Sequence, residues 1–102
     1  MENVAITGLG VISSIGLGIT DFNANLLAGK VVAGPVTSKD DHENIWMSLI
    51  DGFDATRWME ERVVRNSTAF SQYAVAAAAQ AVKDAGIEAF DPMRTAVVIG
   101  SA

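Results

Sequence analysis

Cysteine is absent from the 102-residue sequence, and proline occurs only twice. Without cysteine the chain can form no disulfide framework and no thiolate metal site, and it has no thiol nucleophile. Basic residues are also scarce, because seven Lys and Arg stand against twelve Asp and Glu, for a formal net charge of −5. This balance argues against a nucleic-acid partner, since counterion release needs a basic surface.

A basic leader and a long apolar run are missing as well. The N-terminus begins Met1, Glu2, Asn3 and is acidic where a secretory signal needs positive charge, so a cytoplasmic protein is expected. Residues 66–82 have no charge, but most of them are alanine or polar. A membrane-spanning helix needs about 20 strongly apolar residues, so this stretch predicts a buried helix and no membrane partner.

Half of the residues are apolar, and the length suits one domain. Continuous apolar runs at residues 4–6 and 96–99 predict short buried strands, residues 45–50 predict another, and residues 31–33 are expected to be extended. Together with the helices described next, these uninterrupted strands indicate an α/β fold with a parallel sheet covered on both faces. The run 96–99 lacks a following helix to cover it, so residues 1–102 are expected to form an incomplete domain.

Three helices are expected. The first spans residues 20–28, with Thr20 as N-cap and Gly29 as the C-terminal stop. A short helix follows over residues 56–64. The third is capped by Asn66 or Ser67, runs to Ala85 and ends in a Schellman turn at Gly86. Its apolar face is expected to contain Phe70, Ala74, Ala77, Ala81 and Ala85.

The stretch GLGVISSIGLG (residues 8–18) has four glycines and follows the first predicted strand. A dinucleotide fingerprint needs G-x-G-x-x-G and an acidic residue about 20 positions later, but Ser13 occupies the third glycine position and Lys30 lies near the acidic one. A P-loop fails too, since Leu17 follows Gly16 where lysine is required. We therefore interpret the glycines as packing residues that let a strand, a turn and a helix approach closely.

The segment KDDHEN (residues 39–44) contains His42, the single histidine of the chain, and predicts an exposed loop. Asp40, Asp41, His42 and Glu43 could attract a divalent ion, but four adjacent loop side chains do not converge as EF-hand ligands do. We expect His42 to be solvated and the chain to have no metal site.

Three segments in sequence order resemble the β-ketoacyl-acyl carrier protein synthases, the condensing enzymes of fatty-acid and polyketide synthesis. The family's usual opening, V-V-I-T-G-x-G with S-x-x-G and a short helix, is similar to VAITGLGVISSIGLGITDFNANLLAGK (4–30). The family's Ala-rich helix is similar to FSQYAVAAAAQAVKDAGI (70–87), and its next strand and turn to RTAVVIGSA (94–102). The matches cover most of the chain outside residues 34–56.

The resemblance implies a thiolase-like fold, with two similar halves layered α/β/α/β/α, of which residues 1–102 would be the N-terminal segment. It also implies decarboxylative condensation of an acyl thioester with malonyl carrier protein. A cysteine at a helix N-terminus accepts the acyl chain, and two histidines assist the loss of CO₂. Those residues lie further along the family's sequence, so we expect no catalytic residue, no cofactor and no activity in the 102 residues alone. A homodimer or heterodimer is expected, with the rest of the fold or a partner chain completing the sheet.

In this family the partner is an acidic acyl carrier protein, and a basic stretch before the Ala-rich helix helps to dock it. Arg62 and Arg65 match such positions and are expected to share a helical face. The alternative is that both are ordinary surface charges, with Glu61 and Arg65 forming a weak i, i+4 pair. The chain also departs from the family. The sequence Arg65-Asn66-Ser67-Thr68 stands where the family often reads R-M-D, so the expected acidic residue is absent, and Glu60 and Glu61 replace neighbours that are often basic.

Several interpretations remain open. A catalytic ketosynthase of fatty-acid or polyketide synthesis is favoured. A chain-length-factor-like subunit without the nucleophile and a decarboxylase-type relative would begin with similar sequences. A free-standing nucleotide-binding α/β module is a third possibility, which the failed glycine motifs oppose.

Overall fold

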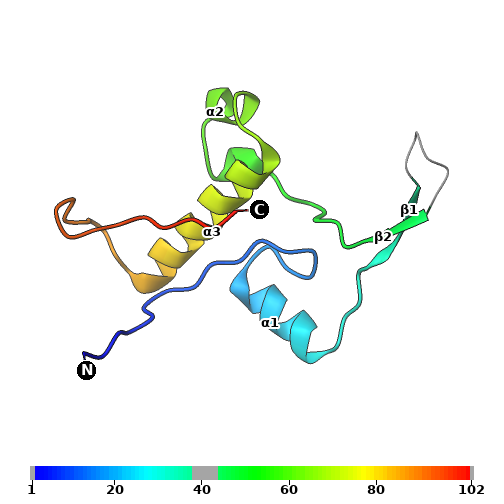
Figure 1. Ribbon diagram of the computed structural model, residues 1–102, viewed down its shortest axis with the longest axis horizontal. Coiled ribbons are helices and arrows are strands. Elements are labelled where there is room, and N and C mark those ends of the chain that lie inside the picture. The colour runs from blue at the N-terminus through cyan, green and yellow to red at the C-terminus, as the bar shows by residue number, and fades with distance from the viewer. Residues whose placement is uncertain (1, 38–43, 102) are drawn as a thin grey trace.

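The computed structural model describes residues 2–37 and 44–101, and its regular secondary structure is mainly helical. The elements are α1 (Ile19–Leu27), β1 (Gly34–Thr37), β2 (Asn44–Met47), the short 3₁₀ helix η1 (Ala55–Arg57), α2 (Glu61–Arg65) and α3 (Ala69–Ala85). Figure 1 shows the β1–β2 hairpin standing apart from the helices. The mixture of helices and strands is consistent with the predicted α/β class.

The Ala-rich segment forms α3, and its predicted end at Ala85 is confirmed. Gly86 has φ 67°, and the amide of Ile87 donates to the carbonyl of Val82 at 3.3 Å, which completes the Schellman turn. None of the helices in the described parts of the chain is long and apolar enough to cross a membrane.

The start of α3 differs from the prediction, because Thr68 is the N-cap. Asn66 and Ser67, the predicted caps, close the preceding helix instead. The Asn66 side-chain amide donates to the carbonyl of Arg62 at 2.8 Å, and the Ser67 hydroxyl donates to that of Val64 at 3.3 Å. Side chains that satisfy the last carbonyls of α2 are then turned away from the first amides of α3.

Helix α1 begins one residue before the predicted helix. Its N-cap is Gly18, whose carbonyl accepts the amide of Phe22 at 3.0 Å, so Thr20 lies inside the first turn and its prediction as the cap is wrong. Gly29 has φ 68°, and the amide of Lys30 bonds back into the helix. The predicted stop at Gly29 is therefore confirmed.

The helix predicted over residues 56–64 is divided into η1 and α2. Asp54 caps η1 through its side chain, and the chain then becomes extended at Glu60, with φ −63° and ψ 145°. The carbonyl of Glu60 accepts the amides of Val63 and Val64 at 2.9 and 3.0 Å, which starts α2 as a new helix. Each of the two short helices thus begins at its own N-cap, Asp54 or Glu60, and no continuous helix is formed.

Strands β1 and β2 pair antiparallel, with Pro35 opposite Trp46 and Val36 opposite Ile45. The strand predicted over residues 45–50 therefore ends at Met47. Residues 31–33 are not part of a strand, because pairing begins only at Gly34.

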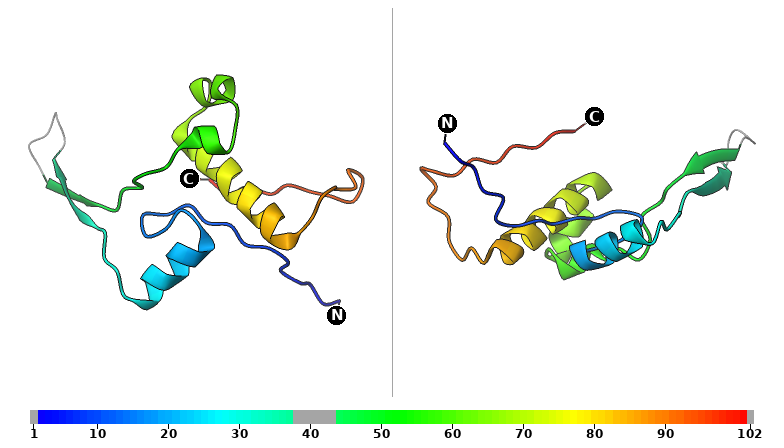
Figure 2. Two further views of the ribbon diagram at one scale, coloured as in Figure 1. Left: turned by 180° about the vertical axis from the view of Figure 1, so that it is seen from behind. Right: turned by 90° about the horizontal axis from the view of Figure 1, so that it is seen from below.

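The two central strands predicted at residues 4–6 and 96–99 are not formed. Both runs are exposed, with Val4 92% and Val98 93% accessible, and Figure 2 shows each terminal segment as an open trace. A strand exists only where its amides and carbonyls pair with a neighbour, and neither run pairs with another described segment. The predicted parallel sheet is therefore not formed within the described residues.

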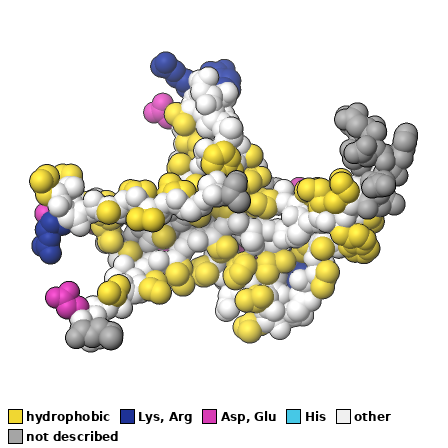
Figure 3. Space-filling view, viewed as in Figure 1, with side chains coloured by type: hydrophobic (Ala, Val, Ile, Leu, Met, Phe, Trp, Pro, Cys, Tyr) yellow, Lys and Arg dark blue, Asp and Glu magenta, His cyan; other side chains and the backbone are white. Residues whose placement is uncertain are grey.

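Burial is slight throughout the described residues, of which only Ala55 and Ala76 are buried apolar residues. Figure 3 shows hydrophobic side chains spread over the visible face. The radius of gyration is 16.8 Å, whereas a compact domain of 100 residues has about 13 Å. The described chain is thus an open arrangement around α3, and most of its apolar surface lacks a protein partner.

Candidate functional site

The glycine stretch packs directly against α3. Residues 8–12 run along this helix, as both views of Figure 2 show. A Cβ atom on Gly8 would overlap the carbonyl oxygen of Ala81, and one on Gly10 would overlap that of Ala77. Only glycine permits this approach of one backbone to another, so the interpretation as packing residues is confirmed for Gly8 and Gly10.

Polar side chains of α3 then fix the same stretch. The Asp84 carboxylate accepts the amide of Leu9 at 2.9 Å. The side chain of Gln80 accepts the amide of Val11 at 3.1 Å and donates to the carbonyl of Leu17 at 2.8 Å. The backbone of this stretch has few partners of its own, and α3 supplies three hydrogen bonds to it.

Sequence reasoning did not single out Gln80 and Asp84. The signal was present, because the two residues are four apart and flank the stripe that contains Ala77 and Ala81. Polar groups beside a stripe of small residues are well placed to bond a backbone that packs on that stripe. The spacing alone does not say which backbone it will be.

A surface hollow of about 550 Å³ lies where the glycine stretch, α1 and α3 meet, and Trp58 forms part of its lining. Its charged lining residues are Lys83 and Asp84, and Asp84 is already bonded to the amide of Leu9. Two polar residues of its lining, Gln80 and Asp84, therefore hold backbone groups of the glycine stretch.

Asp54 fixes the segment that leads into α2. Its carboxylate accepts the hydroxyl of Thr56 at 2.6 Å and the amide of Thr56 at 3.0 Å. These bonds, the hydroxyl bond first, lower the pKa of Asp54 below its ordinary value of 3.8, with a smaller contribution from the charge of Arg57. The side chain of Phe53 next to it contacts Tyr73 of α3 edge-on, with ring centroids 4.9 Å apart.

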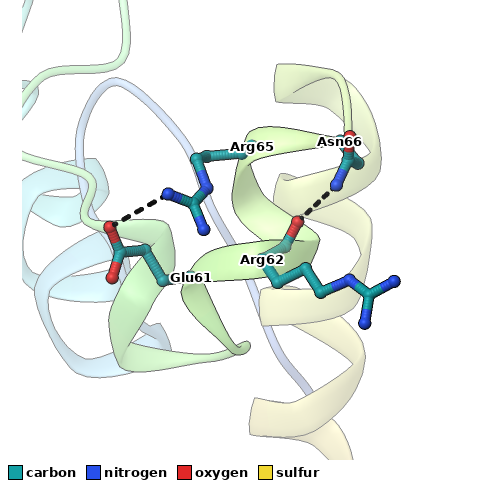
Figure 4. Close-up of polar contacts among 4 residues, drawn as sticks. All are labelled: Glu61, Arg62, Arg65 and Asn66. Carbon is teal, nitrogen blue, oxygen red and sulfur yellow. Dashed lines mark hydrogen bonds and ion pairs between the residues drawn. The ribbon is translucent and has the colours of Figure 1, made fainter.

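The predicted docking residues Arg62 and Arg65 both lie on α2 and are exposed. Nη1 of Arg65 lies 4.0 Å from Oε1 of Glu61, so the weak i, i+4 pair that the sequence predicts is formed. Figure 4 shows Arg65 turned toward Glu61 and Arg62 turned to the other side of the helix. The structure thus keeps both arginines on one element but separates their guanidinium groups.

Basic side chains gather over α2 at one end of the molecule, with acidic atoms beside them (Figure 3). The acidic neighbours in sequence are Glu60 and Glu61, both exposed. Exposed charges of both signs therefore gather at this end of the molecule.

The predicted loop histidine, His42, lies outside the described residues, as do Asp40, Asp41 and Glu43. Within residues 2–37 and 44–101, no group of three His, Cys, Asp or Glu side chains is placed to hold a metal ion.

The sequence model of a protein family described as "Beta-ketoacyl synthase, N-terminal domain" matches residues 1–102. Similar proteins include the 3-oxoacyl-[acyl-carrier-protein] synthase 2 of Coxiella burnetii, which is 34% identical over 98% of this chain and 25% of its own length. The protein of the same name from Rhizobium meliloti is 36% identical over 99% of this chain and 27% of its own length.

A third similar protein is the granaticin polyketide putative beta-ketoacyl synthase 1 of Streptomyces violaceoruber. It is 36% identical over 99% of this chain and 25% of its own length. The chain thus spans about a quarter of the length of the curated relatives it matches.

Proposed function

The chain belongs to the β-ketoacyl synthase N-terminal domain family, and we propose that it is the N-terminal segment of a cytoplasmic condensing enzyme. The family match over residues 1–102 is the observation on which this proposal rests, and the names of the relatives, 3-oxoacyl-[acyl-carrier-protein] synthase 2 and a polyketide putative beta-ketoacyl synthase, agree with it. The proposed reaction is a decarboxylative Claisen condensation in fatty-acid or polyketide synthesis.

In the proposed reaction an enzyme thiolate first takes the acyl group from its carrier as a thioester. Malonyl carrier protein then loses CO₂, and the carbanion that remains attacks the thioester carbonyl. The new carbon–carbon bond forms as the thiolate leaves, which yields 3-oxoacyl carrier protein. The 102 residues contain no cysteine, so the nucleophile must come from another part of the protein, and this segment alone is inactive.

The role of this segment is to build and hold the fold. We place residues 4–6 and 96–99 as strands of a thiolase-like α/β/α/β/α structure, in which further chain or a partner subunit covers them. Their exposure supports this placement, because Val4, Val97 and Val98 are each more than four-fifths accessible. Surfaces of this kind are stable in water only when other protein covers them.

Docking of an acidic acyl carrier protein at Arg62 and Arg65 is the second part of the proposal. Both residues are exposed on α2, and arginine suits the recognition of carboxylate and phosphate groups. The contacts would be solvent-accessible, so they affect the association rate and its salt dependence more than the final affinity.

The activity is tested with the intact natural protein, malonyl carrier protein and an acyl carrier protein loaded with a saturated acyl chain. We expect release of CO₂ and formation of a 3-oxoacyl product, followed by mass spectrometry. Release of CO₂ without a new carbon–carbon bond would point to the decarboxylase-type relative. Condensation that appears only when a second ketosynthase chain is added would point to the non-catalytic, chain-length-factor-like subunit.

Docking is tested separately by titrating holo-acyl carrier protein against the Arg65→Glu variant at several salt concentrations. The variant is expected to bind more weakly and to depend less on salt, because a negative charge replaces a positive one where the acidic carrier would dock. An unchanged affinity and salt slope would contradict the docking proposal and would leave the condensation proposal intact.

A further inference from the structure

We infer that Glu61 weakens carrier-protein binding by holding Arg65, and that Arg62 is the principal cationic contact of α2. This inference rests on the proposed docking function and adds to it an order of importance and an attenuating residue. Both arginines lie on α2, but their side chains point to different sides of the helix (Figure 4).

The geometry separates the two arginines. The Arg65 guanidinium lies 4.0 Å from the Glu61 carboxylate, and Figure 4 shows the two side chains turned toward each other. The Arg62 guanidinium is turned away from that pair, and no ion pair to it is formed within the described residues. When an acidic partner approaches, Arg65 is therefore already paired with Glu61, whereas Arg62 is not paired with it.

Exposure makes Glu61 a competitor. Its side chain is 76% accessible and that of Arg65 is 71% accessible, so any surface that reaches Arg65 also meets Glu61. A carboxylate of the partner must displace Glu61 from Arg65 and accept a like charge beside it. At Arg62 neither cost arises, because the acidic group lies on the other side of the helix.

Glu60 provides a matched control within the same turn. It is exposed and has the same charge, and it lies one position from Glu61 at the start of α2. Its side chain makes no capping hydrogen bond, and no ion pair to it is formed within the described residues. A Glu60→Gln change therefore alters the overall charge and the helix terminus as Glu61→Gln does, without releasing Arg65.

The experiment measures binding of holo-acyl carrier protein to the intact natural protein by calorimetry at several salt concentrations. We expect Glu61→Gln to tighten binding about threefold and to steepen the salt dependence, whereas Glu60→Gln changes affinity by less than about 1.5-fold. An equal gain in the two variants would overturn the inference, because it would show a general charge effect. A loss or no gain in Glu61→Gln, with Tm unchanged, would overturn it as well.

Neutralising each arginine in both backgrounds completes the design. With Glu61 present, Arg62→Gln should weaken binding about fivefold and Arg65→Gln less than about twofold. With Glu61→Gln, the loss caused by Arg65→Gln should rise to about fivefold, because Arg65 is then available to the partner. Equal losses for the two arginines with Glu61 present would refute the proposed order of importance. If neither Arg62→Gln nor Arg65→Gln weakens binding, with Glu61 present or with Glu61→Gln, the docking function itself is refuted.

Discussion

The glycine stretch (residues 8–18) and the C-terminal run (residues 96–99) are both apolar, yet they stand in opposite situations. The stretch lies on α3, with two of its amides and one carbonyl bonded by Gln80 and Asp84. The C-terminal run contacts little, and Val98 is 93% accessible. Apolar character alone therefore does not order a segment. An ordered segment also needs a surface that its backbone can approach and partners for its polar groups.

The largest expected effect concerns the run that lacks a partner. If further protein covers residues 96–99, Val98→Asp buries an unpaired carboxylate and should destabilise the intact natural protein by about 4 kcal/mol or more. The measurement is soluble yield followed by thermal unfolding.

Val98→Ile is the control for that variant. It keeps an apolar, β-branched side chain and should change stability by less than about 1.5 kcal/mol. If Val98→Asp unfolds at the same temperature as the unchanged protein, residues 96–99 are exposed to solvent in the intact protein too, and only the glycine stretch is ordered by packing.

The next largest effect is expected where the glycine stretch meets α3. A Cβ atom on Gly10 would overlap the carbonyl oxygen of Ala77, and the neighbour is helix backbone that cannot move aside cheaply. We expect Gly10→Ala to destabilise the protein by about 3 kcal/mol in a denaturant titration.

Gly34→Ala is the matched control, because no atom within 4 Å would meet the new Cβ. It should lie within about 0.5 kcal/mol of the unchanged protein. Equal stability of the two variants would mean that the contact between residue 10 and α3 is not close in solution.

The glycine stretch and residues 96–99 also differ in how well the sequence predicts their structure. Local signals sufficed for the stops at Gly29 and Gly86, because each depends on neighbouring residues. The glycine stretch could be predicted to pack closely, but its partner, α3, lies far along the chain and could not be identified. Local signals also sufficed for the Glu61–Arg65 pair, whose spacing is that of one helical turn. The sequence also predicts that Arg62 and Arg65 lie on a single helix, but it does not predict that their side chains point in different directions.

The errors have physical causes that lie outside the segment concerned. Thr20 has a good capping side chain, but the turn at Gly18 begins α1 earlier. Asn66 was predicted to start α3 and instead closes α2. The runs at residues 4–6 and 96–99 have strand composition, yet strand formation depends on a hydrogen-bonding neighbour that composition does not provide.

A smaller effect is expected from the hydrogen bonds between α3 and the glycine stretch. Gln80→Leu leaves the amide of Val11 and the carbonyl of Leu17 without their side-chain partner, and should cost about 2 kcal/mol in unfolding free energy. Gln80→Glu keeps an acceptor for Val11 and loses the donor to Leu17, so we expect roughly half that cost. If Gln80→Leu is neutral, water replaces both bonds, and close packing alone holds the stretch.

The smallest effect concerns the pH dependence of the segment before α2. Hydrogen bonds from Thr56 lower the pKa of Asp54 below its ordinary value of 3.8. The ionised carboxylate therefore stabilises the folded state at pH values above 3.8. That contribution is lost as the pH falls below 3.8 and through the lower pKa of the folded state. Asp54 is fully exposed, so the change in Tm between about pH 6 and pH 3 should be reduced by only about 1 °C in Asp54→Asn. Thr56→Val, which removes the hydroxyl donor and keeps the carboxylate, should reduce it in the same direction but less, because the amide of residue 56 still donates. An unaltered pH profile in both variants would show that the Thr56 bonds do not favour the ionised carboxylate in the folded protein.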